Sequence, residues 1–443
     1  MNQKLAVVTL GCEKNLVDSE VMMGLVAKNG YDVVQNPEEA DIIIVNTCGF
    51  IDAAKAESVE TILSMAQYKE EGSCKTLLVS GCMVQRYQDE LITEIPEIDG
   101  LVGTGEYHRI NELIDEVKQA DSVPQYVGNP VYLYDELTPR LVTGGASAYL
   151  KIAEGCDHSC TFCAIPSMRG KFRSRPIESI VAEAESLVKQ GVKEVMLIAQ
   201  DSTQYGLDLY GKRNLHKLLE ALNEVDGLEW IRLHYAYPGF FTDEVIDAFA
   251  RLPKVAKYID MPLQHSEDHI LKAMRRPGHQ AQIRRLIDKI RSRVPDVAIR
   301  TSFIVGFPGE TEADFDNLCR FVREIGFDHI GVFAYSPEEG TPSAEMENQV
   351  SEETKERRAS LLMEIGRQVA AERNAARVGK QLKVLIERQD DQNPDVYIGR
   401  TQYDAKEIDG LVFVTGGGRL EAGSMVDVRI THSYDFDLSG ECV

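Results

Sequence analysis

Short apolar runs that favour β-strands alternate with helical segments along most of this chain, and this alternation constrains its fold more than any other feature. In the first third these segments are, in chain order, Leu5–Leu10, Ser19–Asn29, Asp41–Asn46, Ala53–Tyr68 and Thr76–Ser80. Strands that alternate with helices predict a parallel sheet covered by helices. We therefore expect a Rossmann-like α/β domain over residues 1–120.

A second series of strands and helices begins near residue 148, with helices such as Ile177–Gln190 and Gln280–Val294 between the strands. The expected strands are Tyr149–Ala153, Glu194–Ala199, Trp230–Tyr235, Tyr258–Met261, Ala298–Val305 and His329–Ala334. Six β/α units predict a partial (β/α)6 barrel over residues 146–375, short of the eightfold barrel. Functional residues of such a barrel are expected at the C-terminal ends of its strands.

The last part of the chain changes character after a charged helix expected over Glu352–Val378. Short strands with Gly-rich turns follow it, at Gln381–Glu387, Val396–Gly399, Leu411–Thr415 and Met425–Ile430. They predict a small antiparallel β-barrel over residues 376–443. Residues 121–145 carry three prolines and a Gly-Gly pair, and we expect them to be a linker.

The composition describes a globular protein with several hydrophobic cores: 443 residues, 43% hydrophobic and 27% charged. No apolar run approaches the roughly 18 residues of a membrane span. The first apolar stretch is too short for a secretory signal, so we expect a cytoplasmic protein. The formal net charge of −23 disfavours nonspecific binding to nucleic acid and favours basic partners, such as ribosomal proteins or histones.

Nine cysteines, in a chain that we expect to lack a leader, argue against a disulfide framework and for metal binding or chemistry. Three of them, Cys12, Cys48 and Cys82, each follow one of the first three strands and stand beside a glycine. Because the carboxyl ends of parallel strands meet at one edge, these three, here called the N-terminal trio, are expected to converge. Cys74, Cys319 and Cys442 are interpreted as structural, with Cys442 in a fraying chain end.

The strongest chemical signal is a Cys-x3-Cys-x2-Cys loop after the first barrel strand, formed by Cys156, Cys160 and Cys163. These residues, here called the barrel trio, supply three thiolates for the corners of a cubane iron–sulfur cluster and leave the fourth iron open. Zinc is the alternative, but zinc prefers two cysteine pairs or added histidines. His158 lies too close within the loop to complete such a site easily.

A three-cysteine loop of this spacing on a partial barrel resembles the radical S-adenosylmethionine (SAM) superfamily. That resemblance implies that the open iron chelates SAM and that an electron from the cluster cleaves it to a 5′-deoxyadenosyl radical. With the N-terminal trio and a C-terminal barrel of the kind called TRAM, the whole chain resembles the methylthiotransferases. The stretches that look like the RimO-type branch of that family are Gly11–Glu20, Val45–Ile51, Arg169–Arg175 and Gly331–Gly340.

The resemblance implies two 4Fe-4S clusters and two SAM molecules acting on one aspartate of protein twelve of the small ribosomal subunit. One SAM methylates a sulfur held at the N-terminal cluster, and the other yields a radical that removes a hydrogen from the β-carbon, which then takes the methylthio group. No side chain needs to act as a nucleophile, so we name no catalytic residue beyond the cluster ligands. One departure is Lys406, where RimO-type chains usually carry proline.

Four further residues are candidates for contacts to SAM. Gln200 and Asp201 end the second barrel strand, where the superfamily often binds the amino end of SAM, although Asp201 also suits a helix N-cap. Phe162 lies between two cluster cysteines and would flank the adenine or shield the cluster. Arg300, early in the fifth strand, would reach the SAM carboxylate or pair with a neighbouring acid.

Two other functions compete with this hypothesis. The same chemistry on an adenosine of transfer RNA, as in MiaB-like enzymes, would be favoured by a basic groove, whereas the acidic balance favours a basic protein substrate. A non-catalytic iron–sulfur protein for electron transfer or sensing is the alternative of another class. The sulfur donor, the electron donor and the oligomeric state stay open at this point.

Overall fold

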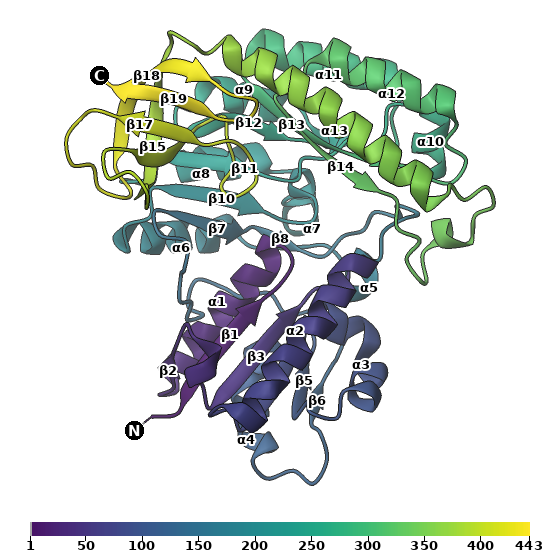
Figure 1. The fold of residues 1–443 in the computed structure, drawn as a ribbon, viewed down its shortest axis with the longest axis vertical. Helices are drawn as coiled ribbons and strands as arrows, with labels where there is room; N and C mark the ends of the chain where they lie inside the picture. The colour runs from purple at the N-terminus through teal and green to yellow at the C-terminus, as the bar shows by residue number, and fades with distance from the viewer. Residues whose placement is uncertain (1) are drawn as a thin grey trace.

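The computed structural model describes residues 2–443, which form three successive units (Figure 1). In the N-terminal unit all strands are parallel, in the order β2-β1-β3-β4-β5-β6. The strands are β1 (Lys4–Thr9), β2 (Asp32–Val33), β3 (Ile42–Thr47), β4 (Thr76–Gly81), β5 (Gly100–Val102) and β6 (Gln125–Tyr126). The predicted parallel-sheet domain is therefore confirmed. Its sheet also takes in β6, from the segment that we expected to be a linker.

Helices cover both faces of the N-terminal sheet: α1 (Glu13–Lys28), α2 (Asp52–Glu71), α3 (Cys82–Glu94) and α4 (Ile110–Val117). Helix α1 begins six residues before the expected start at Ser19, since Cys12 is its N-cap. The first turns were missed because Lys14, Asn15 and Asp18 are polar and yet buried. A helix with buried polar side chains lacks the apolar period by which an amphipathic helix is recognised.

The central unit is an open sheet of six parallel strands in the order β14-β13-β12-β11-β10-β7, as a partial barrel requires. Its strands are β7 (Ser147–Lys151), β10 (Glu194–Ile198), β11 (Trp230–Leu233), β12 (Val255–Asp260), β13 (Ala298–Val305) and β14 (His329–Ala334). The helices that follow them are α6 (Ile177–Lys189), α8 (Leu215–Asn223), α9 (Asp243–Arg251), α11 (Gln280–Arg293), α12 (Glu312–Ile325) and α13 (Glu352–Ala375). The largest apolar core lies among these elements.

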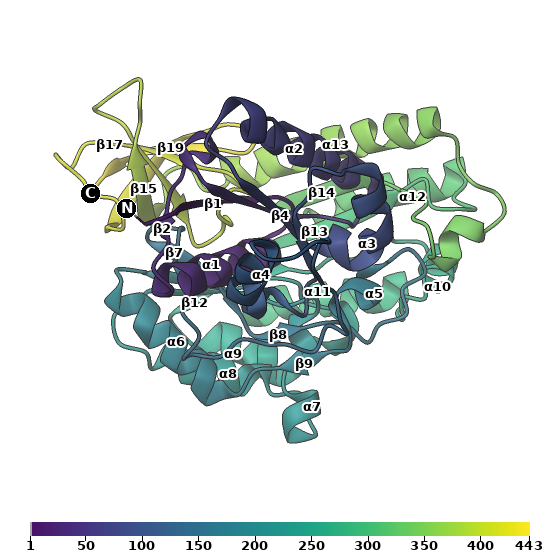
Figure 2. The same cartoon turned by 90° about the horizontal axis from the view of Figure 1, so that it is seen from below.

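The N-terminal unit lies against the barrel, and Figure 2 shows α1 and its sheet in front of the barrel strands. Val17 and Val21 of α1 belong to one hydrophobic core with Tyr149 of β7 and Met196 of β10. The neighbouring residues of β10 belong to the barrel's own core. Because successive side chains of a strand point to opposite faces, the second face of β10 is covered by the N-terminal unit.

The C-terminal unit is a closed barrel in the order β15-β16-β17-β19-β18. Its strands are β15 (Gln381–Gln389), β16 (Tyr397–Thr401), β17 (Val412–Thr415), β18 (Met425–Ser433) and β19 (Leu438–Cys442). Four of the five neighbouring pairs are antiparallel, but β17 and β19 run parallel. The expectation that Cys442 lies in a fraying end is wrong, because it pairs with Val428 in the strand that closes the barrel.

No helix among residues 2–443 combines the length and the apolar character needed to cross a membrane.

Candidate cluster and cofactor site

The barrel trio lies in the loop between β8 (Ala153–Glu154) and α5 (Ile165–Arg169), beyond the carboxyl end of β7. Gly155 starts this loop with a φ of +82°, and a Cβ there would overlap the carbonyl oxygen of Lys171. Only glycine fits at this position, since L side chains rarely adopt such a φ and no space is free. The turn into Cys156 therefore depends on Gly155.

Hydrogen bonds from two other segments fix the middle of the loop at Thr161. Its backbone N–H donates to the carbonyl of Met274 at 3.1 Å, and its hydroxyl donates to the carbonyl of Ala273 at 2.9 Å. The carbonyl of Thr161 in turn accepts from the N–H of Ser343 at 3.0 Å. These hydrogen bonds attach the middle of the cysteine loop to two other segments of the barrel domain, and they do not depend on a bound cluster.

An arginine and an aromatic stack cover the outer side of the barrel trio. Arg276 Nη1 lies 3.9 Å from Cys160 Sγ, and its guanidinium carbon lies 4.3 Å from the ring centroid of Tyr237. The His158 ring stacks on Tyr237 with centroids 4.2 Å apart. His158 Nε2 also lies 2.7 Å from Asp201 Oδ2, so the loop histidine is bound to a carboxylate at the end of β10.

The N-terminal trio emerges at the carboxyl edge of the sheet, as the strand pattern predicts. Cys12 follows β1, Cys48 follows β3, and Cys82 is the first residue of α3 after β4. A Cβ on Gly11 would lie 2.7 Å from Cys48 Cβ, so the Cys12 and Cys48 loops touch. Asn15 joins the loops: its Nδ2 donates to the carbonyls of Leu10 and Thr47, at 2.9 Å each, and its Oδ1 lies 3.7 Å from Cys82 Sγ.

The two trios lie on either side of one domain junction. Cys82 packs in a small apolar cluster with Ala164 and Met168, which belong to the segment directly after Cys163. Helix α5 thus begins two residues after the barrel trio and reaches Cys82 of the N-terminal trio with its apolar side chains.

Burial raises the pKa of Cys82, Cys156 and Cys163 to about 12 in each case. Free thiols with such pKa values keep their protons near neutral pH. A metal must therefore displace the proton to obtain a thiolate ligand, and the metal charge supplies the compensation that the buried sites lack.

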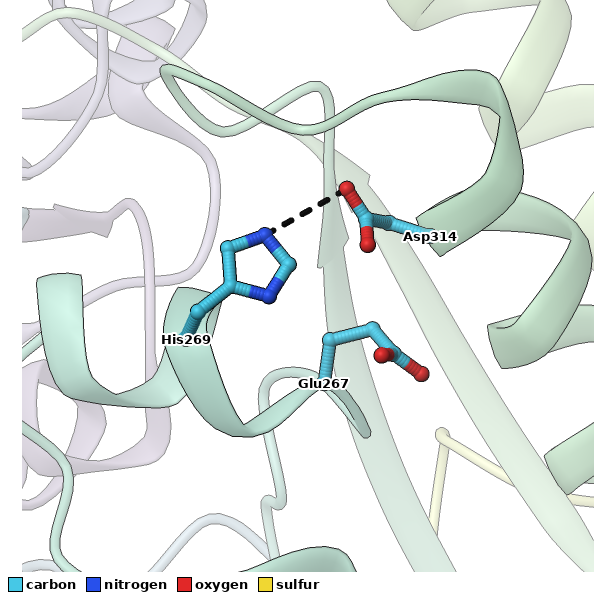
Figure 3. Close-up of side chains that lie close together, drawn as sticks. All are labelled: Glu267, His269 and Asp314. Atoms are coloured by element: carbon cyan, nitrogen blue, oxygen red, sulfur yellow. Dashed lines mark ion pairs between the residues drawn. The ribbon is translucent and has the colours of Figure 1, made fainter.

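One further group of possible metal ligands contains no cysteine. Among residues 2–443, the group of three His, Cys, Asp or Glu ligand atoms within 4.8 Å of one another is Glu267, His269 and Asp314 (Figure 3), and neither cysteine trio is that tight. Ligands on one ion must crowd together, whereas a cubane places each thiolate on a different iron. The Asp314 carboxylate of that group is already bound by Thr311, through its N–H at 2.8 Å and its hydroxyl at 2.6 Å.

Two of the four candidates for SAM contacts, Asp201 and Arg300, bind neighbouring protein groups, which was the structural alternative given for each of them. Asp201 is an N-cap, with Oδ1 accepting from the N–H of Thr203 at 2.9 Å, besides its contact with His158. Arg300 is paired with Asp260 at 3.0 Å and with Asp409 of the C-terminal barrel at 3.4 Å. Both side chains therefore support neighbouring elements in this structure.

The other two candidates keep capacity for a ligand. Gln200 donates from Nε2 to Glu154 Oε1 at 2.5 Å, while its own Oε1 is buried without a hydrogen-bond partner. An orphaned buried acceptor at the end of a barrel strand fits a donor such as an amino group. Phe162 is half-buried and packs against a cluster that contains Met274 and Phe307, so it also shields this side of the loop.

Reasoning from the sequence missed three residues that contact the cysteine sites: Asn15, Arg169 and Arg276. Asn15 and Arg169 are buried, and each contacts the other across the domain junction. Their role depends on a contact between segments more than 150 residues apart, which a pattern within one segment does not reveal.

Family models match three separate segments of the chain. Residues 4–103 match the uncharacterized protein family UPF0004, residues 150–322 the radical SAM superfamily and residues 378–443 the TRAM domain. Among solved structures, the radical SAM methyltransferase TsrM of Kitasatospora setae, with cobalamin and a [4Fe-4S] cluster bound, has a TM-score of 0.57 at 15% identity, over 77% of this chain and 74% of that chain. This is a likeness of fold.

Curated relatives are similar along their full length. The ribosomal protein uS12 methylthiotransferase RimO of Desulforamulus reducens is 51% identical over 438 residues, which is 99% of each chain. The protein of the same name from Geobacter sulfurreducens is 50% identical over 442 residues, covering 100% of this chain and 99% of the other. At this identity and coverage, and with its matches to the radical SAM superfamily and the TRAM domain, the chain belongs to the RimO family of radical SAM methylthiotransferases.

Proposed function

We propose that this enzyme adds a methylthio group to the β-carbon of an aspartate in ribosomal protein uS12, with one 4Fe-4S cluster on each cysteine trio and SAM bound at the barrel trio. The observation that carries the proposal is the packing of Cys82 against α5, directly after Cys163. It brings two sets of three thiols to one junction, where a group held at one trio is within reach of a reaction at the other.

The bound clusters and SAM supply a carbon-centred radical and a methylated sulfur, neither of which a protein side chain can generate. The chain contributes ligands, orientation and exclusion of water. Cys12, Cys48 and Cys82 would hold one cluster, and the barrel trio the other. Since each set has three thiols, one iron of each cluster stays open to an exchangeable ligand.

The residues around the barrel trio have distinct parts in this proposal. Gln200 Oε1 is the acceptor for the amino group of SAM, because it is buried and unpartnered. Phe162 covers the cofactor with an apolar ring. Asp201 and Arg300 are positioning residues: Asp201 holds His158 of the cluster loop, and Arg300 holds β13 against the C-terminal barrel.

The charge of the chain supports a basic protein as the substrate. A net charge of −23 attracts a cationic ribosomal protein and repels an RNA backbone. Such a substrate is met in the cytoplasm, free or on the ribosome.

The substrate assignment is tested by incubating the anaerobically reconstituted enzyme with SAM and a reductant, in parallel with purified uS12 and with bulk transfer RNA. We expect mass spectrometry to find the methylthio group on one aspartate of uS12 and none on RNA. A mass gain confined to transfer RNA would show the MiaB-like reaction instead. Intact SAM after reduction would indicate an electron-transfer protein.

A further inference from the structure

A buried arginine of the barrel domain reaches into the N-terminal cysteine site. Arg169 is the last residue of α5 and is only 3% exposed. Its Nη1 donates to Asp18 Oδ2 at 2.6 Å, and its Nη2 donates to Asn15 Oδ1. Both partners lie on α1, so the guanidinium of Arg169 links the barrel domain to the N-terminal unit.

Asn15 connects Arg169 to all three cysteine loops. The same Oδ1 that accepts from Arg169 lies 3.7 Å from Cys82 Sγ, while the amide nitrogen binds the carbonyls just before Gly11 and Cys48. Met168, the neighbour of Arg169, packs against Cys82. The position of the N-terminal trio therefore depends on a side chain that the barrel domain delivers.

The charges around Arg169 are closely balanced. Lys151 is fully buried and pairs with Asp18 at 2.5 Å and with Glu154 at 2.6 Å, and Arg169 contacts the same two carboxylates. Two cations thus offset two anions, with Arg169 nearest to the cysteines.

We propose that Arg169 is a positioning residue of the N-terminal cluster that sets its reduction potential, so that this cluster site is complete only when the barrel domain is docked. The inference rests on the proposed function, because it requires a cluster on Cys12, Cys48 and Cys82. It adds that a group six residues after the barrel trio controls the electron affinity at the other trio.

The direction of the effect follows from charge. Reduction adds one negative charge to the cluster, and a buried cation beside it stabilises the reduced form more than the oxidised form. Without Arg169, Lys151 alone faces Asp18 and Glu154, and the surroundings of the cluster become net negative. The midpoint potential of the N-terminal cluster then falls.

The test uses the full chain with Cys156, Cys160 and Cys163 replaced by alanine, so that iron binds only at the N-terminal trio. Redox titration followed by electron paramagnetic resonance gives the midpoint potential in this background. We expect Arg169→Gln to lower it and Arg169→Lys, which keeps the charge, to restore most of the loss. Arg140→Gln is the matched control: Arg140 is a buried arginine at the same junction, paired with Glu20 and Glu183.

If Arg169→Gln does not fold, Asp18→Asn tests the same charge balance: it removes one carboxylate partner of Arg169, leaves the positive charge in excess, and is expected to raise the midpoint potential. An unchanged potential in whichever variant folds, or an equal fall in Arg140→Gln, would overturn the role of Arg169. Absence of iron from the N-terminal trio in the parent background would instead refute the two-cluster function itself. The two failures are therefore distinguishable.

Discussion

Arg400 of β16 donates from Nη2 to Glu194 Oε2 at 2.6 Å, and both side chains are fully buried. Arg232 of β11 binds the other oxygen of the same carboxylate at 2.7 Å. Glu194 is the first residue of β10, so this ion-pair cluster fastens the C-terminal barrel to the amino end of the central sheet. The opposite, carboxyl end carries the cluster loop.

Replacement of Glu194 tests how much this ion-pair cluster contributes to the free energy of unfolding. Glu194→Gln leaves Arg232 buried without a counter-charge and Arg400 paired only with Glu387, and breaking a buried pair in this way costs about 3–5 kcal/mol. We expect a matching loss in the free energy of unfolding, measured by urea denaturation of the full chain. Glu220→Gln is the control: Glu220 forms only surface pairs with Lys217 and Arg251, which are worth at most about 1 kcal/mol.

The same carboxylate makes stability depend on pH. Although burial alone raises the pKa of Glu194, Arg400 and Arg232 hold it well below the usual value. A depressed folded-state pKa stabilises the fold above the unfolded value of about 4.3, and this contribution is lost as pH falls toward the folded value. The stability advantage of the natural chain over Glu194→Gln should be constant from pH 7 to 5 and shrink below about pH 4. An advantage that grows on acidification would contradict the assignment.

Replacing a cysteine of one trio is expected to block a different step of the reaction from replacing a cysteine of the other trio. Cys156→Ala should abolish reductive cleavage of SAM, because the barrel trio is the proposed cofactor site. Cys48→Ala should still allow SAM cleavage to 5′-deoxyadenosine but stop transfer of the methylthio group. High-performance liquid chromatography of the nucleoside and mass spectrometry of uS12 measure the two steps separately.

Cys319→Ala is the matched control for both variants, since Cys319 is buried within α12 of the barrel core. It should keep both steps. If Cys48→Ala and Cys156→Ala retained full transfer activity, neither trio would hold a cluster that the reaction requires.

Glu338 forms a second link between the domains. It is 2% exposed, and its carboxylate accepts from Lys55 at 2.9 Å, from Arg86 at 3.1 Å and from the N–H of Asp52 at 2.9 Å. Glu338→Gln should loosen α2 and α3 from the barrel and increase hydrogen exchange in α2, with SAM cleavage retained and methylthio transfer reduced. Glu339→Gln is the control, because only the backbone carbonyl of Glu339 is used. Equal exchange in both variants would show that Glu338 does not hold the junction.

Much of the fold follows from the sequence where strands are buried on both faces. The expected strand Asp41–Asn46 overlaps β3, because its run Ile42–Val45 is continuous, apolar and β-branched, as is typical of parallel strands. Strand β19 was missed because Ser439, Gly440 and Glu441 carry no apolar pattern, and they form a strand only because they close a barrel. The closure of the C-terminal barrel cannot be predicted from the sequence of this segment alone.

The site was predictable to a similar degree. The six cysteines of the two trios were named from spacing and from their places after strands, and each lies where the pattern indicated. Asn15, Arg169 and Arg276 were not named as candidate site residues, because their contacts arise only when distant segments fold together. The composition shows the net charge of the chain, but it does not show which charged side chains form buried ion pairs.

The central claim is that two separate clusters face each other at the domain junction. The most direct test is the iron and sulfide content of the anaerobically reconstituted protein, with each trio replaced in turn by alanine. We predict about eight irons per chain in the natural protein and about four in each triple variant, from four irons per cluster. About four irons in the natural protein, with none lost when Cys12, Cys48 and Cys82 are replaced, would contradict the account.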